Sequence, residues 1–197
     1  MFPPFDTAQG ERPQVIVKDQ PVYSPEERAQ LIQLAHQAIE SALAGRPLEL
    51  KAPSEHLSQQ RAAFTTLHLE GELRGCVGFV APMYPLYRTI AETALAAAFE
   101  DNRFPPVNAE EAPRLKIEIS VLSPLVPIQP EEVVVGKHGL VVSHHGRRGL
   151  LLPQVPVEHG WNRDTFIAET CRKAGLPKDA VLHGATLEAF TAEVFGE

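Results

Sequence analysis

The segment that most restricts the fold is 115–122, where apolar and polar side chains alternate as far as Val121. The apolar positions are Leu115, Ile117, Ile119 and Val121. A period of two is the period of a β-strand that buries one face. Since one strand can neither pair its backbone nor bury that face alone, the chain must supply a sheet and a layer that covers it.

A hairpin that supplies neighbouring strands is expected just upstream. Residues 63–69 are rich in strand-forming side chains, and 73–80 run back after a turn at Glu70-Gly71-Glu72. Two such runs joined by a short glycine-containing connection are typical of an antiparallel hairpin.

Three helices are expected over 24–45, 86–99 and 163–174. In the first, Ser24 can cap the helix and Glu27 stands where a capping box places its acid. The second is rich in alanine, which predicts close packing against a sheet or another helix.

Further strands are predicted at 133–135, 140–143 and 149–152, with a hairpin tip at 144–148. A final strand is favoured at 187–195, where a helix remains the alternative. Hairpins mixed with isolated helices, without a regular β-α alternation, predict an α+β fold with a mixed or antiparallel sheet and flanking helices.

The charge balance excludes some classes of partner, and the positions of the prolines show which part of the chain is expected to be ordered. Among 197 residues, 18 basic against 25 acidic side chains give a net charge of -7. This balance makes nucleic acid an unlikely partner, because binding to it relies on a basic surface. The 18 prolines fall mostly at the ends of expected elements, and only residues 1–20 are expected to form a loose tail.

The cysteine count and the apolar runs bear on the compartment. Only Cys76 and Cys171 are present, whereas small secreted domains are usually rich in disulfides. The start of the chain has no apolar run of signal-peptide length, and the longest run elsewhere, 94–99, is far too short to cross a membrane. We therefore expect a cytoplasmic protein with no membrane contact.

The most informative motif for function is Leu73-Arg74-Gly75-Cys76-Val77-Gly78. In a regular strand Arg74, Cys76 and Gly78 share one face. An arginine beside a thiol stabilises the thiolate, which a nucleophilic or redox cysteine needs. Glycines within a strand mark a bulge or a close approach of backbone or ligand. The alternative is that Cys76 is a small apolar side chain packed where the glycines admit a neighbour.

Glu118 and Ser120 lie on the polar face of the alternating strand. Such a face is either exposed to solvent or lines a cleft in which its polar groups find partners. The cleft interpretation gains weight only if this strand lies beside the strand that carries Arg74 and Cys76.

Among the other candidates, His138 precedes a strand, where its ring could act as a general acid or base, although an ordinary loop histidine is the alternative. Cys171 lies on the apolar face of the third helix and is predicted to belong to the core. His144 and His145 are adjacent and no metal-binding spacing is present, so no metal site is predicted.

Several blocks of the sequence resemble the AMME syndrome chromosomal-region candidate protein family, whose bacterial and archaeal members are called AmmeMemoRadiSam system protein A. The similarity covers roughly residues 24–197 and departs from the family pattern at Asn102, where a proline is expected. The blocks are 73–78 (LRGCVG), 101–107 (DNRFPPV), 117–122 (IEISVL), 135–140 (VGKHGL), 151–155 (LLPQV), 161–166 and 171–177 (CRKAGLP).

The resemblance implies a two-lobed α+β domain over 21–197, made of two subdomains with a groove between the lobes. It places the Arg-Gly-Cys block near that groove, together with Glu118, Ser120, His138 and Gln154. Memo-like and radical S-adenosylmethionine proteins are possible partners by this resemblance, and no cofactor is implied.

Two functional hypotheses follow. In the first, the protein is a thiol-dependent enzyme or modification factor that acts through Cys76 on a small-molecule or protein partner. Its catalytic residues are Cys76, Arg74, Glu118 and His138, and its substrate-binding residues are Gly75, Gly78, Ser120, Gln154 and Arg103. In the second, the groove belongs to a non-catalytic binding or adaptor module that holds a peptide, a small ligand or a protein, and Cys76 is structural.

Overall fold

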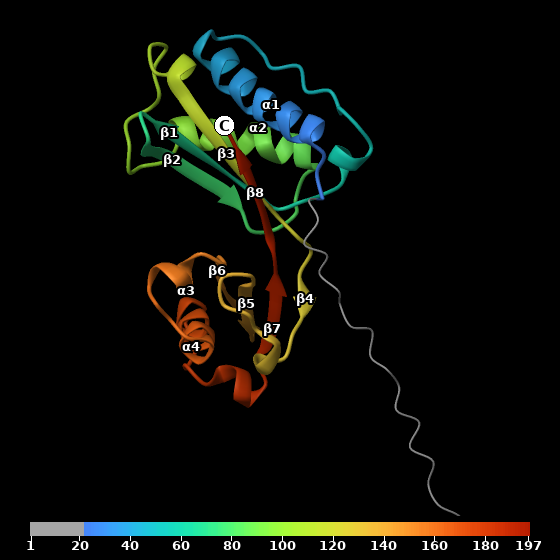
Figure 1. Cartoon of the computed structure of the whole chain (residues 1–197), viewed down its shortest axis with the longest axis vertical. Helices are drawn as coiled ribbons and strands as arrows, with labels where there is room; N and C mark the ends of the chain where they lie inside the picture. The colour runs from blue at the N-terminus through green and yellow to red at the C-terminus, as the bar shows by residue number, and fades with distance from the viewer. Residues whose placement is uncertain (1–21) are drawn as a thin grey trace, which may run out of the picture.

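The computed structural model describes residues 22–197, so the tail predicted at 1–20 lies outside the described residues. The described chain forms two lobes, each built on a four-stranded antiparallel sheet (Figure 1). Helices and two antiparallel sheets make this an α+β fold, as the sequence predicts.

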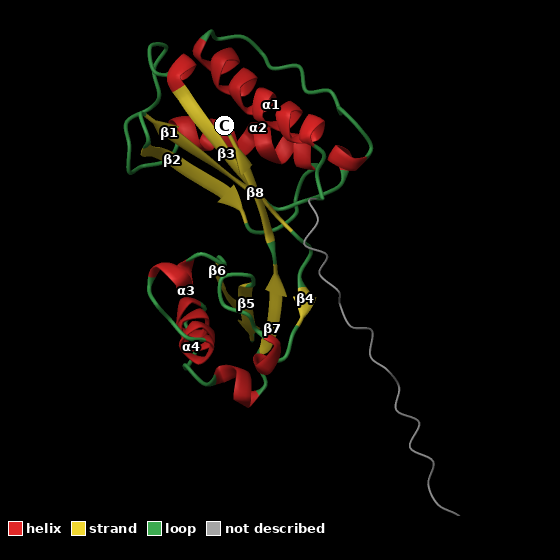
Figure 2. Cartoon of the chain, in the orientation of Figure 1, coloured by secondary structure: helices red, strands yellow, loops and turns green. Residues whose placement is uncertain are grey.

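The first lobe combines two long helices with the first sheet. Its strands lie in the order β2-β1-β3-β8, and α1 and α2 cover one face of the sheet (Figure 2). The elements are α1 (Pro25–Leu43), η1 (His56–Ser58), β1 (Ala63–Leu69), β2 (Glu72–Phe79), α2 (Leu86–Phe99), η2 (Ala112–Arg114), β3 (Leu115–Leu122) and β8 (Ala192–Gly196).

Local sequence explains the start of α1 and the turn of the hairpin. The Ser24 hydroxyl accepts the Glu27 N–H at 3.2 Å, and the Glu27 carboxylate accepts the Ser24 N–H at 3.0 Å, which is the predicted capping box. In the turn, Glu70 and Gly71 both have positive φ, as a two-residue hairpin connection that matches the strand twist requires. The predicted helix over 86–99 and the strand over 115–122 are confirmed.

The second lobe contains the second sheet and the shorter helices. Its strands lie in the order β4-β7-β5-β6, and α4 packs against β5 and β6. The elements are β4 (Val126–Pro127), η3 (Pro130–Glu132), β5 (Gly139–His144), β6 (Arg147–Leu151), α3 (Val155–Glu158), α4 (Arg163–Lys173), η4 (Ala180–His183) and β7 (Thr186–Phe190).

Two predictions in this part of the chain need correction. Residues 133–135 are not a strand: the Val134 carbonyl accepts the N–H groups of Lys137 and His138, so the chain closes into a turn. The final strand at 187–195 is divided between β7 and β8, which belong to different sheets.

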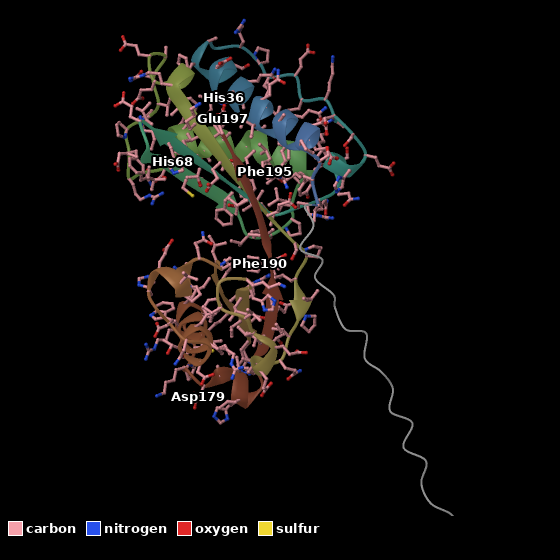
Figure 3. The ribbon with its side chains drawn as sticks, viewed as in Figure 1. His36, His68, Asp179, Phe190, Phe195 and Glu197 are labelled. Atoms are coloured by element: carbon pink, nitrogen blue, oxygen red, sulfur yellow. The ribbon has the colours of Figure 1, made fainter. Side chains whose placement is uncertain are left out.

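The two lobes share a small apolar cluster. Ala62, Leu122, Val141 and Phe190 are buried there, with Phe190 at the junction where β7 leads into β8 (Figure 3). Next to it the Ser123 N–H bonds the Thr191 carbonyl at 2.8 Å, and the Ser123 hydroxyl accepts the Thr191 N–H at 2.9 Å. The crossing segments are thereby tied together, which brings one face of the first sheet opposite the second lobe.

Within residues 22–197, none of the helices combines the length and the apolar composition needed to cross a membrane.

Candidate functional site

A β-bulge in the hairpin determines which way the Arg-Gly-Cys block faces. His68 pairs with Leu73, but the next residue of β1, Leu67, pairs with Gly75. Arg74 is therefore an extra residue without a partner in β1. One extra residue reverses the face of every later position of β2, because side chains alternate with a period of two.

The bulge separates the motif between the two faces of the sheet. Gly75 lies against α2: a Cβ there would stand 2.1 Å from the Ala97 carbonyl oxygen. Gly75 therefore admits the alanine-rich helix and does not line the groove, in contrast to its predicted substrate-binding role. Cys76 and Gly78 lie on the opposite face, which we call the groove face.

The groove face carries a row of three polar side chains. Thr66 of β1 pairs with Cys76 of β2 on one side and with Glu118 of β3 on the other. The Thr66 hydroxyl donates a hydrogen bond to the Cys76 sulfur at 3.3 Å. Cys76 and Glu118 thus share a face, although β3 does not lie beside β2 as the cleft interpretation required.

Glu118 and Ser120 are half-buried on this face, and within residues 22–197 their side chains have no hydrogen-bond or ion-pair partner. Ser120 pairs with Phe64 of β1 and Val194 of β8. Both polar groups are therefore available to a ligand or to solvent.

The backbone of Cys76 is held by two side chains from the segment after α2. Its N–H donates to Asp101 Oδ2 at 2.9 Å, and its carbonyl oxygen accepts from Arg103 Nη2 at 3.4 Å. Asp101 and Arg103 also pair with each other at 2.7 Å and 2.9 Å. The hydrogen bond from Arg103, with those from backbone N–H groups, holds the pKa of Asp101 far below its ordinary value, and the same pair raises the pKa of Arg103.

The Arg74 guanidinium forms an ion pair with a different carboxylate, that of Glu111. Its Nε and Nη2 donate to the two oxygens of Glu111 at 3.1 Å and 3.0 Å, and the side chain is only 9% exposed. The hydrogen bonds from Arg74 lower the pKa of Glu111. Since this pair already neutralises the guanidinium, the predicted activation of Cys76 by Arg74 has no geometric support.

His138 lies in the turn before β5. Its Nδ1 accepts the Val134 N–H at 3.2 Å, so the neutral ring carries its proton on Nε2. Burial and the nearby Lys137 charge lower the pKa of His138. The geometry therefore suits a hydrogen-bond donor better than the general base that the sequence predicts.

Gln154 comes to the groove from the second lobe. It stands at the N-cap of α3 and lines a hollow of about 350 Å³ together with Lys137, Val157 and Val194. Because Val194 is the β8 partner of Ser120, this hollow borders the groove face. The structure thus brings Gln154 close to the partner strand of Ser120, whereas Ser120 itself does not line this hollow.

Gly78 makes room for an aromatic ring. A Cβ at this position would stand 2.2 Å from the ring of Phe64. Phe64 in turn packs against the cluster that the two lobes share. Gly78 is thus needed for the junction itself, and a direct role in binding a substrate is not required to explain it.

Cys171 is fully buried in the core of the second lobe, as predicted. Burial raises the pKa of its thiol. The rings of His144 and His145 are in contact at the tip of the β5–β6 hairpin, tilted by 59° with centroids 3.9 Å apart. In the part of the chain that the structure describes, no group of three or more His, Cys, Asp or Glu side chains is placed to hold a metal ion.

Two contributors, Thr66 and Asp101, are missing from the sequence-based set. A regular hairpin would pair Thr66 with Gly75, so only the bulge places it against the thiol. Asp101 did carry a signal, since an acid two residues before Arg103 is well spaced for a local ion pair.

Comparisons with known proteins agree on one family. A family model described as AMMECR1 matches residues 32–195. Protein MJ0810 of Methanocaldococcus jannaschii is 39% identical over 182 residues, which cover 87% of this chain and 90% of that protein. A protein of Thermococcus gammatolerans is 44% identical over 182 residues, 85% of this chain and 88% of its own. The crystal structure of Uncharacterized Protein PH0010 from Pyrococcus horikoshii matches with a TM-score of 0.73 at 42% identity, covering 85% of this chain and 90% of that one.

Proposed function

The chain belongs to the AMMECR1 family, and we propose that it acts as a thiol-dependent enzyme or modification factor whose nucleophile is Cys76 in the groove between the lobes. The observation that carries the proposal is the hydrogen bond from the Thr66 hydroxyl to the Cys76 sulfur. A donor aimed at sulfur favours the thiolate, which is the nucleophilic form of cysteine.

The fixed backbone of Cys76 supports the same proposal. Asp101 and Arg103 hold its N–H and its carbonyl, so the direction of the Cα–Cβ bond is constrained. A nucleophile held in one orientation loses less entropy when it reacts than one on a free loop. The half-buried position also leaves the sulfur within reach of a substrate in the groove.

The reaction class follows from these groups. The thiolate adds its electron pair to an electrophilic carbon of the substrate, and the leaving group departs with the electron pair of the bond that breaks. The thiol proton leaves to solvent when the thiolate forms, because one intervening strand keeps Glu118 about 10 Å from Cys76 across the sheet, too far for direct transfer. Glu118 lies on the same face, where it exchanges a proton with the bound substrate. Ser120 and Gln154 orient the substrate, and the exposed face of Arg103 attracts an anionic group.

The test is the rate at which iodoacetamide alkylates Cys76 at pH 7.5, followed by mass spectrometry of the intact fold. Cys171 is an internal control because it is fully buried. We expect Cys76 to react at least about tenfold faster than free cysteine under the same conditions, while Cys171 stays unmodified. A rate no higher than that of free cysteine would contradict the proposal.

A binding or adaptor module remains the second candidate, because Arg74, Gly75 and Gly78 each have a packing explanation that needs no chemistry. The variant Cys76→Ser separates the two. A binding module keeps its ligand and its cellular activity with serine, whereas a thiol enzyme loses turnover and retains the fold.

A further inference from the structure

The edge strand β2 leaves hydrogen-bonding groups open next to Cys76. Since β2 is the first strand of its sheet, alternate residues direct both N–H and C=O away from β1. Cys76 is such a residue, because its backbone bonds Asp101 and Arg103 instead. By the period of two Gly78 is the next, and within residues 22–197 its N–H and C=O have no hydrogen-bond partner.

An apolar hollow begins where β2 ends. It measures about 190 Å³ and is bounded by Val80 and Pro82 after the strand. The remaining apolar lining comes from both lobes, namely Ala62, Leu122, Pro124, Leu125, Leu150 and Phe190. Val80 and Met83 are exposed beside it, at 45% and 54%. Open backbone groups next to an apolar hollow are the two parts of a site for an extended peptide: the edge gives main-chain hydrogen bonds and the hollow gives side-chain selection.

We infer that the open edge of β2 binds the carboxyl-terminal end of an extended peptide, which adds to the sheet as an antiparallel strand. The inference goes beyond the proposed function, because it describes a peptide-binding site beside Cys76 and assigns no reaction to the peptide's carboxylate.

The register of the added peptide follows from the backbone groups of β2 that already have hydrogen-bond partners. Asp101 and Arg103 cover the edge at Cys76, so the last residue of the peptide lies opposite Val77. The penultimate residue then exchanges two hydrogen bonds with Gly78. The residue fourth from the end reaches Val80, where its apolar side chain enters the hollow.

The positive charge of Arg103 favours the carboxyl terminus of a peptide, rather than an internal segment, at this end of the site. In an antiparallel addition the peptide ends at Arg103, whose side chain is 56% exposed and whose Nη1 forms none of its hydrogen bonds with Asp101 or Cys76. A terminal carboxylate there gains a charge-assisted hydrogen bond and lies beside the Cys76 thiol. A second copy of the chain is a poorer occupant, because the Asp101–Arg103 pair blocks the longer pairing that two β2 strands would need.

The experiment keeps the protein unchanged and varies a peptide. The probe is a fluorescein-labelled octapeptide that ends in Leu-Thr-Ala-Thr with a free carboxylate, measured by fluorescence anisotropy. Methylating the penultimate backbone nitrogen removes a hydrogen bond to Gly78, and we expect an affinity loss of about tenfold or more. Methylating the third nitrogen from the end is the matched control, since that N–H points away from β2, and it should change affinity by less than about twofold.

Two further peptides test the ends of the site. An amidated terminus should weaken binding by about tenfold through loss of the carboxylate at Arg103. Asparagine in place of the leucine should also weaken binding by about tenfold, because it is uncharged and cannot replace the apolar contacts of the hollow. The inference is overturned by equal losses from the two methylations, by undiminished binding of the amide, or by no saturation up to about 1 mM probe. A dimer that the probe does not dissociate would also overturn it.

The same measurements on Cys76→Ser separate this inference from the proposed function. Serine removes the thiolate and leaves the edge backbone in place, so the selectivity among the peptides should persist. Peptide selectivity together with ordinary alkylation of Cys76 would support the edge site and remove the thiol mechanism.

Discussion

The Thr66 hydroxyl donates a hydrogen bond to the Cys76 sulfur across the hairpin, with 3.3 Å between oxygen and sulfur. Thr66 and Cys76 face each other across the two strands. The backbone groups of Cys76 bond Asp101 and Arg103, so the two residues form a non-hydrogen-bonded pair, in which facing side chains are close. The Thr66 hydroxyl can therefore stabilise a negative charge on the sulfur.

Thr66→Val tests that neighbour with almost no change of shape. Loss of the donor should slow alkylation of Cys76 at pH 7.5 by about three- to tenfold, because the negative charge on the attacking sulfur loses the hydrogen bond that stabilises it. Thr165→Val in the second lobe is the control and should leave the rate unchanged. An unchanged rate in Thr66→Val would mean that the hydroxyl is not what sets the reactivity of Cys76.

Arg74→Met should lower the free energy of unfolding and leave the alkylation rate of Cys76 unchanged. It leaves the Glu111 carboxylate, 17% exposed, without its cation, and we expect the free energy of unfolding to fall by about 3 kcal/mol in urea titrations. The double variant Arg74→Met/Glu111→Leu should regain a large part of that loss, because no charge is then buried alone. If Arg74→Met instead slows alkylation of Cys76 as strongly as Thr66→Val does, Arg74 acts on the thiol after all.

Local patterns predicted most of the first lobe. The capping residues of α1, the turn at Glu70-Gly71 and the alternation of β3 each depend on side chains close together in the sequence. For the same reason the apolar face of α4 predicted a buried Cys171. These elements form as predicted because their signals do not depend on distant partners.

The site was harder to predict because it depends on contacts between distant parts of the chain. The bulge at Arg74 accompanies an ion pair with Glu111, 37 residues away, and the close approach of Ala97 to Gly75. A regular strand would instead have put Arg74 and Cys76 on one face. The motif thus identified the right segment, but the direction of its side chains follows from tertiary structure.

Gly75→Ala tests the close approach of α2 to the sheet. The new Cβ would stand 2.1 Å from the backbone oxygen of Ala97, and a helix backbone cannot move aside cheaply. We expect a loss of about 3 kcal/mol in the free energy of unfolding. Glu72→Ala, at the exposed start of the same strand, should stay within about 0.5 kcal/mol of the parent protein. Equal stability of the two variants would mean that α2 shifts freely over the sheet.

Asp101→Asn should change how stability depends on pH. The folded protein holds the pKa of Asp101 below its ordinary value, chiefly through the hydrogen bond from Arg103. A lowered folded pKa means that the unfolded chain binds the proton more readily, so this carboxylate stabilises the fold at neutral pH. That stabilisation is lost as the pH falls from about 5, through the ordinary Asp value of about 3.9, towards the folded pKa.

Urea titrations from pH 7 to pH 2 measure this contribution as the difference between the parent protein and Asp101→Asn. The variant should be less stable at pH 7, and the difference should narrow as the pH falls below about 4, because the unfolded parent chain then binds a proton at Asp101 more readily than the folded protein does. Other carboxylates with lowered pKa, such as Glu111, act in both proteins and cancel in the difference. Glu70→Gln, in an exposed pair with Arg114, is the matched control and should give a small difference at all pH values. If the difference in the free energy of unfolding between the parent protein and Asp101→Asn stays constant down to pH 2, Arg103 does not stabilise the charged form of Asp101. The contacts of Asp101 and Arg103 with the Cys76 backbone would then depend on hydrogen bonds that need no charge on Asp101.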